Sequence, residues 1–328
     1  MRTTLDEIKR PVVGEIARYE RYLAETLRSD TELAQTMLEY ILETRGKGIR
    51  PMMVLLSASM LNGGAPLPED SLVAAMLIEM THTASLVHDD IIDEADIRRG
   101  KPSVKAKWRT SLAVLIGDYI LAKTYSYGLD KEFYTLTTYV AHVMTQLCEG
   151  EIMQSDQSDR QEMTRRIYDD IIHRKTASLM GRSCGSGAIS VGAAREDIER
   201  MEQFGHTLGI AFQIKDDILD YSPAEETGKE AGSDIRERKI NLPLLYVLDA
   251  SDEQERQRLT ALLGRSNVDP AAAAELFDAV VSRGGTDMAE TEVDRYIDEA
   301  RAILSHYPSS PYRDSLDLLC DYLGGRNN

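Results

Sequence analysis

Cysteine is scarce in this chain of 328 residues, which contains only three. Cys148, Cys184 and Cys320 lie far apart, and none belongs to a C-x-x-C pair. A disulfide framework needs more cysteines in a shorter chain, and a structural zinc site needs closely spaced ligands. We therefore expect three reduced thiols in a cytoplasmic protein.

Positive charge is also in short supply. Lysine and arginine together number 38 against 55 aspartates and glutamates, so the net charge is −17. Nucleic acids and anionic membranes favour basic surfaces, so we expect neither as a main partner. The sequence offers no uninterrupted run of about 18 apolar residues for a transmembrane helix, and its start, MRTTLDEIKRP, lacks the apolar core of a signal peptide.

Runs of strictly alternating apolar and polar residues, which would indicate strands, are missing as well. Apolar residues instead recur every three or four positions, as in LDEIKRPVVGEIARYERYLAETL near the N-terminus. The pattern predicts an all-α fold. Further helices are predicted over residues 31–44, 51–61, 70–95, 108–127, 131–156, 165–191, 195–221, 241–249, 253–264, 270–283, 287–306 and 311–323. No linker is long enough to mark a boundary, so we expect one domain over residues 1–328.

Breaks between these helices are marked by glycine and proline, in NGGAPLP (62–68) and RRGKPS (98–103). The polar stretch SPAEETGKEAGSD (222–234) is long enough to indicate a functional loop. The small residues of CGSGAISVG (184–192) imitate a nucleotide-binding loop, but no strand precedes them. Close packing between helices is the better interpretation of that stretch.

Two acidic clusters stand at the ends of apolar helices. In HDDIIDEADIRRG, the carboxylates of Asp89 and Asp93 share one helix face and Asp90 lies about 100° away. Such like charges repel, by about 1 kcal/mol in water and about 4 kcal/mol at an effective dielectric of 20. One cluster alone would most often be a solvated helix end.

The second cluster changes that interpretation. QIKDDILDY repeats the spacing with Asp216, Asp217 and Asp220, again after an apolar helix. If the two clusters face each other, six carboxylates line one cavity. Hard divalent cations with oxygen ligands would relieve the repulsion, and Mg²⁺ is usually held by a few carboxylates together with substrate phosphates.

Basic residues near glycines complete the pattern. RGKGIRP (45–51) carries Lys47 and Arg50, and Arg98 and Arg99 follow the first acidic cluster. Glycine allows the backbone to approach an anion, and lysine and arginine suit phosphate. A phosphorylated substrate, bridged to the carboxylates by metal, would explain why both signs of charge converge.

In these motifs the chain resembles the trans-prenyltransferases, the all-trans polyprenyl diphosphate synthases. GKGIRP, DDIID with RRGKPS, the KT pair of HRKTAS, FQIKDDILD and the GK-x₂-GSD loop occur in the family order and cover nearly the whole chain. RRGKPSVKAKW is similar to the catalytic subunit of heptaprenyl-type synthases. The resemblance implies a single bundle of long helices around a deep central cavity.

It also implies a reaction. An allylic diphosphate ionises with the help of Mg²⁺, about three ions per site with Mn²⁺ as a substitute, and the double bond of isopentenyl diphosphate attacks the cation. The expected partners are these two substrates and a second copy of the chain, with a small regulatory subunit as the alternative. No nucleic acid and no integral membrane association are expected.

Matched position by position, the resemblance assigns roles to individual residues. The metal ligands are Asp89, Asp90, Asp93, Asp216 and Asp217, with Asp220 weaker or behind them. The allylic diphosphate is gripped by Arg98, Lys175, Thr176, Gln213 and Lys229, with Lys239 as a further match. The isopentenyl diphosphate site comprises Lys47, Arg50, His82 and Arg99.

A few neighbouring residues stay open between two interpretations. Phe212 fits either the hydrophobic core or the wall of the site. Glu151 and Gln154 fit either metal-bound water or a solvated helix surface.

Product length is predicted from the residues just before the first cluster. In this family bulky side chains there floor the cavity, whereas this chain has Thr81, Ala84 and Ser85. Small residues leave room for a longer product, about C30 to C50. A short-chain farnesyl or geranylgeranyl synthase is the alternative.

Three other classes fit the motifs less well. A terpene cyclase usually pairs DDxxD with an Asn/Ser/Glu motif, whereas the second motif here is DDILD. A non-catalytic regulatory subunit typically loses the aspartate clusters, and both are intact. A head-to-head synthase would not need an isopentenyl diphosphate site.

Overall fold

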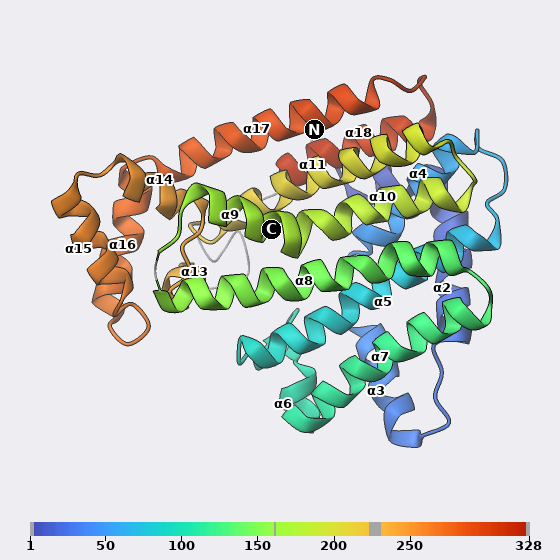
Figure 1. Cartoon of the computed structure of the whole chain (residues 1–328), viewed down its shortest axis with the longest axis horizontal. Helices are drawn as coiled ribbons and strands as arrows, with labels where there is room; N and C mark the ends of the chain where they lie inside the picture. Colours follow the sequence, from blue (N-terminus) through green and yellow to red (C-terminus); the bar gives the residue numbers. More distant parts are fainter. Residues whose placement is uncertain (1–2, 161, 223–230, 326–328) are drawn as a thin grey trace.

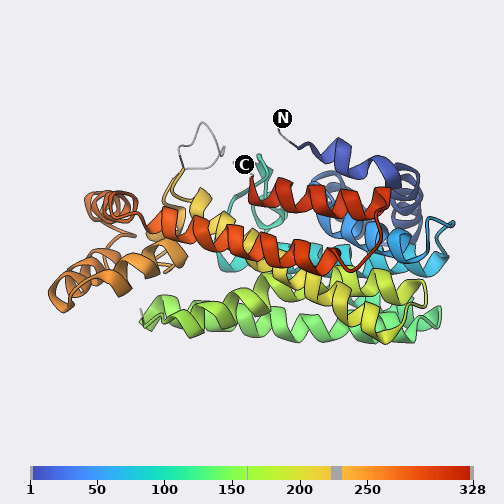
Figure 2. The same ribbon diagram turned by 90° about the horizontal axis from the view of Figure 1, so that it is seen from above.

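The computed structural model describes residues 3–160, 162–222 and 231–325, and it confirms the all-α prediction (Figures 1 and 2). The N-terminal half comprises α1 (Leu5–Lys9), the 3₁₀ turn η1 (Arg10–Val12), α2 (Val13–Thr26), α3 (Glu32–Glu43), α4 (Ile49–Leu61), α5 (Glu69–Ile92), α6 (Val104–Trp108), α7 (Thr110–Asp130) and α8 (Tyr134–Arg160). The C-terminal half comprises α9 (Arg165–Ile172), the π turn η2 (His173–Ala177), α10 (Ser178–Ser190), α11 (Arg195–Leu219), α13 (Ser233–Arg236), α14 (Leu242–Ala250), α15 (Glu253–Leu263), α16 (Pro270–Ser282), α17 (Gly285–Leu304) and α18 (Pro311–Gly324).

Capping side chains fix where several helices begin. Thr164, Asn241, Asp252, Asp269 and Ser310 each accept a hydrogen bond from a backbone N–H in the first turn of the helix that follows. Such a cap satisfies one of the four N–H groups that a helix start leaves without a partner. The predicted helix starts at 165, 241, 253, 270 and 311 therefore agree with the structure to within one residue.

The buried centre is built around α10, which packs on α4, α5 and α11, and α4 also packs on α5 (Figure 1). Helix α5 is buried along most of its length, as its apolar sequence predicts. Two glycines allow close approach. A Cβ at Gly187 would come within 2.4 Å of the Val54 carbonyl oxygen, and one at Gly205 within 2.3 Å of that of Met180. The small residues of 184–192 thus serve helix packing, as expected.

The long helix predicted over 165–191 is interrupted by η2. A π turn widens the helix by one residue and is frequent at functional sites. Here it contains Lys175 and Thr176, and it packs against α8 and α11. Gly150 of α8 makes room for the π turn, because a Cβ at this position would lie 3.0 Å from the backbone nitrogen of Lys175.

A short hairpin follows α5 where the sequence indicated only a break. Strands β1 (Ile97–Arg98) and β2 (Lys101–Pro102) pair antiparallel, joined by Arg99 and Gly100. Both turn residues have positive φ, 53° and 74°. Two-residue hairpins need this backbone, which costs a non-glycine residue about 1 kcal/mol or more. The hairpin turns Arg98 back onto α5, and Arg99 lines the same small cavity as Arg98 and Asp90.

None of the helices in the described part of the chain is long and apolar enough to cross a membrane.

Candidate active site

The first acidic cluster, Asp89, Asp90 and Asp93, lies at the C-terminal end of α5. Asp90 is only 3% exposed and accepts from the Arg98 guanidinium, through Nε at 2.7 Å and Nη2 at 2.5 Å. Both nitrogens contact the same oxygen, Oδ1, and the hairpin makes this contact possible because it folds Arg98 back over the helix end. Such a charged partner offsets much of the cost of burying the carboxylate.

Asp89 borders a cavity, and the cations near it compensate its charge less fully than Arg98 compensates that of Asp90. Burial raises the pKa of its carboxyl to about 7, and the charges of Glu151 and Asp93 add to the effect. Lys175 and Arg98 oppose it but do not cancel it. The Asp89 carboxylate is therefore buried without full compensation of its charge.

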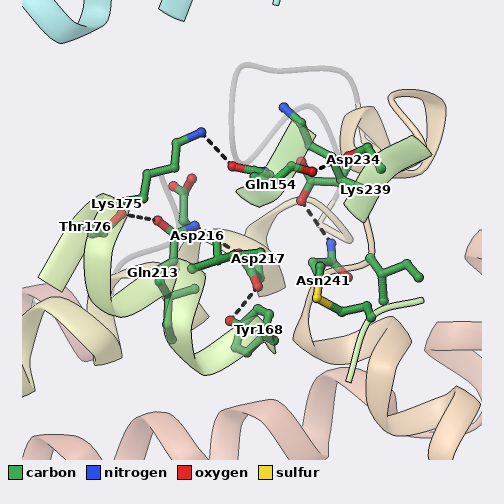
Figure 3. A pocket seen from close by; sticks show the side chains of 15 residues that line it. Gln154, Tyr168, Lys175, Thr176, Gln213, Asp216, Asp217, Asp234, Lys239 and Asn241 are labelled. Carbon is green, nitrogen blue, oxygen red and sulfur yellow. Dashed lines mark hydrogen bonds between the residues drawn. The ribbon is translucent and has the colours of Figure 1, made fainter. Parts of the chain in front are cut away.

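The second acidic cluster, Asp216, Asp217 and Asp220, ends α11. Figure 3 shows Asp216 and Asp217 of this cluster. Buried Asp217 accepts from the Tyr168 hydroxyl at 2.7 Å, the Leu242 N–H at 3.1 Å and the Gln213 amide at 3.0 Å. Burial raises its pKa to about 6 despite these bonds.

Asp220 is occupied differently. One of its oxygens accepts from the Ser233 N–H and hydroxyl, and the other accepts from the Asp234 N–H. Its carboxylate thus caps the start of α13, and its place behind the metal ligands stays a prediction.

Two lysines connect the clusters. Lys239 lies 3.3 Å from Asp93 and also lines a cavity of about 220 Å³ with Asp216 and Asp217. Burial opposes the charge on Lys239, but Asp93 and Glu237 raise its pKa. Lys175 lines this cavity and a larger one of about 540 Å³, where it joins Asp89. The six carboxylates therefore do not line one cavity, although the repeated motif predicted this: Asp89 borders the larger of two adjoining cavities, and Asp216 and Asp217 border the smaller.

The π turn supplies the polar groups where the cavities meet. Lys175 donates to Gln154 at 2.7 Å and pairs with Glu151 at 2.5 Å (Figure 3 shows the first contact). Thr176 donates to Gln213 at 2.7 Å. Glu151 and Gln154, for which the sequence left two roles open, thus contact a predicted substrate-binding lysine.

Of the four predicted isopentenyl diphosphate residues, Arg50 and His82 line the larger cavity, whereas Arg99 and Lys47 each line a different one. Arg50 donates to His82 Nε2 at 2.9 Å. Burial and the Arg50 charge hold the pKa of His82 well below its usual range, so the imidazole is neutral and accepts this bond. The buried Arg50 Nε has no hydrogen-bond partner among the described residues. A diphosphate oxygen is the kind of acceptor that would satisfy it.

Residues 45–48, here called the glycine loop, connect α3 to α4. Arg99 and Lys47 contact their surroundings in ways that hold this loop in place. Arg99 donates to the Thr44 carbonyl at 3.1 Å and packs on Gly46, where a Cβ would lie 2.5 Å from its Nη2. Lys47 donates to the Tyr322 hydroxyl at 3.1 Å. The Arg99 guanidinium thus occupies the space that a side chain at position 46 would take.

The other predicted residues lie in three situations. Ser85 lines the larger cavity, whereas Ala84 and Thr81 are fully buried, and Thr81 shares a hydrogen bond with Tyr125. Phe212 packs partly buried against the core. Lys229 lies outside the described residues.

Sequence reasoning missed several residues of the site. Tyr168 carried no signal, because one tyrosine on an apolar helix is ordinary core. Asp234 was visible in the GSD motif but received no role. Burial and the charges of Asp220 and Asp217 raise its pKa to about 8, and Asn241 donates to it. Buried Glu79 was hidden within the apolar run of α5.

The carboxylate oxygens of the site are ligands of the kind that a hard divalent cation prefers. No group of three histidines, cysteines or acidic residues within the described ranges forms a ready-made metal cage. Carboxylates with raised pKa values nevertheless border both cavities, as Asp89 and Asp217 show. Mg²⁺ commonly takes one or two carboxylates plus substrate phosphates, which suits a site whose acidic groups are divided in this way.

Comparison with known proteins identifies the family. A model of the polyprenyl synthetase family matches residues 31–280. The chain belongs to the polyprenyl synthetase family. It is therefore a prenyltransferase with the all-α isoprenoid synthase fold, and the resemblance seen in its motifs is confirmed.

Individual relatives match this polyprenyl synthetase over most of its length. It is 36% identical over 314 residues to heptaprenyl diphosphate synthase component 2 of Geobacillus stearothermophilus, covering 95% of this chain and 96% of that protein. It is 33% identical over 290 residues to the short chain isoprenyl diphosphate synthase of Methanothermobacter thermautotrophicus, covering 87% and 88%. The crystal structure of a polyprenyl synthase from Caulobacter crescentus CB15, complexed with calcium and isoprenyl diphosphate, matches with a TM-score of 0.91 at 28% identity, covering 100% and 99%.

Proposed function

We propose that this polyprenyl synthetase joins isopentenyl diphosphate head to tail to an allylic diphosphate and repeats the step to a product of about C30 to C50. The observation that carries the proposal is the meeting of two cavities at Lys175 and Thr176. One cavity is polar and bordered by the second cluster, and the other is larger, borders Asp89 and continues along apolar walls.

The residues divide between the two substrates. Asp89, Asp90, Asp93, Asp216 and Asp217 would hold Mg²⁺, about three ions, with Asp220 behind them and Mn²⁺ as a substitute. The bound metal would stabilise the negative charge of the departing diphosphate. The allylic diphosphate would lie against Arg98, Lys175, Thr176, Gln213, Lys229 and Lys239, and isopentenyl diphosphate against Lys47, Arg50, His82 and Arg99.

The chain's own groups account for the chemical steps. The C–O bond of the allylic diphosphate breaks, and the cations around it stabilise the leaving group more than the substrate. Thr176, held by Gln213, presents its oxygen to the allylic cation. The double bond of isopentenyl diphosphate attacks, a new C–C bond forms, and a proton leaves C2 to the released diphosphate. Neutral His82 orients Arg50 without adding a charge.

The test is an incubation of the protein with Mg²⁺, radiolabelled isopentenyl diphosphate and farnesyl diphosphate. We expect elongated prenyl products on thin-layer chromatography after extraction, and their mobility gives the length. A folded protein that yields none, alone or with a small subunit supplied, would refute the proposal.

Product length rests on the larger cavity. Ser85 is one of its lining residues, so a phenylalanine there would fill space that the growing chain needs. We expect Ser85→Phe to shorten the product, and an unchanged length would contradict this account. A short product from the unmodified enzyme would favour the short-chain alternative, which one relative's name also represents.

Assembly is proposed from the open side of that cavity. Ile92, Val114 and Ile152 line it and are 54%, 41% and 69% exposed. A second copy laid over α7 and α8 would cover these side chains and close the cavity to water.

We propose a homodimer in the cytoplasm, in which each chain forms one domain. The alternative is a complex with a small second subunit. That alternative is supported by the name of one relative, a synthase component. Mass photometry of the purified chain distinguishes a dimer from a monomer.

A further inference from the structure

Tyr40, near the C-terminal end of α3, contacts the hairpin that carries Arg98 and Arg99, yet no step of the proposed reaction uses it. Its hydroxyl donates to the Pro102 carbonyl oxygen at 2.7 Å. Proline has no N–H and cannot donate to a strand ladder, which leaves its carbonyl as the backbone group that can anchor it. The hydroxyl of Tyr40 therefore joins β2 to a helix that lies 62 positions earlier in the sequence.

The ring of Tyr40 is held in place from the other side of the hairpin. Trp108 packs against it edge to face, with the ring centroids 5.1 Å apart and the planes at 79°. Lys107 Nζ lies 3.5 Å from the centroid of the Tyr40 ring and 4.6 Å from that of Trp108. Both arrangements are attractive, because a ring edge and a cation each favour the negative face of an aromatic ring. These contacts direct the Tyr40 hydroxyl at β2.

A second contact joins the same turn of α3 to the hairpin. The Thr44 N–H donates to the Tyr40 carbonyl at 3.1 Å, and the Thr44 carbonyl in turn accepts from Arg99 Nη1 at 3.1 Å. Tyr40, Thr44, Arg98 and Arg99 all line one small cavity of about 40 Å³. The end of α3 therefore supports the hairpin at two points, β2 and the turn.

The hairpin depends on such outside support. Its ladder has only two residue pairs, and a two-stranded hairpin is at best marginally stable by itself. Arg99 in its turn has a φ of 53°, a conformation that persists only where the surrounding structure fixes it. The two arginines are held unequally, because Arg98 is also bound to Asp90, whereas Arg99 is bound to the Thr44 carbonyl.

We propose that Tyr40 is a positioning residue: by fixing the hairpin, it sets the place from which Arg99, and to a smaller extent Arg98, presents its charge to a diphosphate. The inference rests on the proposed function, in which Arg99 contacts isopentenyl diphosphate and Arg98 contacts the allylic diphosphate. A guanidinium that is already in place loses less conformational freedom on binding than a mobile one, which favours affinity. The larger effect falls on isopentenyl diphosphate, because Asp90 holds Arg98 independently.

The test is Tyr40→Phe, which keeps the ring and removes only the hydroxyl. We expect the Kd for isopentenyl diphosphate, measured by calorimetry without an allylic primer, to rise about 3- to 10-fold. In turnover, KM for isopentenyl diphosphate should rise by a similar factor, while kcat and KM for the allylic primer stay within about twofold. A general weakening of the fold would not divide the two substrates in this way.

Arg99→Lys shows whether Tyr40 acts through Arg99. In a protein that already carries Arg99→Lys, adding Tyr40→Phe should change the Kd by less than about twofold. The control is Tyr119→Phe, which removes a hydroxyl-to-carbonyl bond of 3.3 Å elsewhere on the surface and should leave the Kd unchanged. Losses that add fully in the double variant, or an unchanged Kd in Tyr40→Phe, would overturn the inference.

Hydrogen exchange follows the hairpin without any substrate. The Ser103 N–H donates to the Asp96 carbonyl at 2.8 Å and so closes the hairpin. Its exchange should be faster in Tyr40→Phe than in the unmodified protein or in Tyr119→Phe, and an equal rate in all three would also overturn the inference. If the unmodified protein makes no product, the proposed function fails, whereas this exchange rate still reports on Tyr40 separately.

Discussion

The two acidic clusters have nearly the same sequence, DDIID and DDILD, yet the structure surrounds them differently. In the first cluster, Asp90 is held by Arg98 and Asp93 by Lys239, both of them cations. In the second, Asp217 is held by a tyrosine, an amide and a backbone N–H, all of them neutral. Sequence spacing alone did not distinguish these environments.

The difference indicates how each cluster would respond to a metal ion. A carboxylate that is already paired with arginine gives up part of that pairing when it binds a cation. A carboxylate fixed by neutral donors keeps its orientation and its full charge. We infer that the second cluster is the more rigid support and that the first is the more adjustable one.

Removing Asp89 should have the largest effect. We expect Asp89→Asn to lower kcat by about 10²- to 10³-fold, because the carboxylate that is least compensated is lost. The fold should become more stable. The raised pKa means that the native state binds more protons than the unfolded state between about pH 4 and 7, so ionised Asp89 destabilises the fold increasingly as pH rises through this range.

Thermal unfolding without metal measures this gain, which should be present at pH 8 and absent at pH 4. Asp96→Asn is the control, because Asp96 follows the same helix but is exposed and pairs with Lys105. A lower unfolding temperature for Asp89→Asn at pH 8 would contradict the assignment.

Replacing the cation of the first cluster should come next. Arg98→Lys keeps the charge but loses the two-point contact with Asp90. We expect kcat/KM to fall about 10- to 100-fold and the free energy of unfolding to fall by about 1–3 kcal/mol. Arg109→Lys, at an exposed position, is the matched control. Equal activity of the two variants would mean that the two-point contact with Asp90 does not matter.

A neutral donor of the second cluster is tested by Tyr168→Phe. The ring stays and only the hydroxyl that donates to Asp217 is lost. We expect about a 10-fold weaker apparent Mg²⁺ affinity in activity assays and a loss of about 1 kcal/mol in unfolding free energy. Tyr119→Phe is the control, because it removes only an exposed hydrogen bond from the tyrosine hydroxyl to the Arg28 carbonyl. It should change neither the Mg²⁺ affinity nor the unfolding free energy. Unaltered Mg²⁺ dependence in Tyr168→Phe would remove the basis for calling this cluster a rigid support.

Metal binding should release protons in a narrow pH range. With pKa values of about 7 for Asp89 and about 6 for Asp217, both are partly protonated at pH 6.5, and a bound cation displaces those protons. Calorimetry in two buffers of different ionisation enthalpy should show release at pH 6.5 and almost none at pH 8.5. The release should decrease in Asp89→Asn, and equal release at both pH values would be inconsistent with these carboxylates as ligands.

The smallest effect is expected at Asp220. Because both of its oxygens are engaged by Ser233 and Asp234, Asp220→Asn should cost about 1 kcal/mol of stability as a weakened cap. Its kcat should stay within about threefold of the unmodified value. Thermal unfolding measures the loss of stability, and steady-state kinetics measures kcat. A 100-fold loss of kcat would make Asp220 a metal ligand as important as Asp217.

Much of this architecture was predictable because it depends on local patterns. Apolar periodicity and the glycine and proline breaks located the long helices, and both DDxxD clusters were predicted at helix ends. The π turn at Lys175 and the Arg99–Gly100 hairpin were not predictable, because each depends on packing against distant elements. Tyr168 and Glu79 were hidden for the same reason, since a residue's partners across the fold leave no mark on its neighbours in the sequence.

The central claim is that the two clusters act together on one metal–diphosphate assembly. A double-mutant cycle of Asp89→Asn and Asp216→Asn, with kcat/KM for the allylic diphosphate as the readout, tests it most directly. If both clusters hold the same assembly, the second substitution should cost far less once the first is made, with a coupling of about 1 kcal/mol or more. Losses that simply add would contradict the claim.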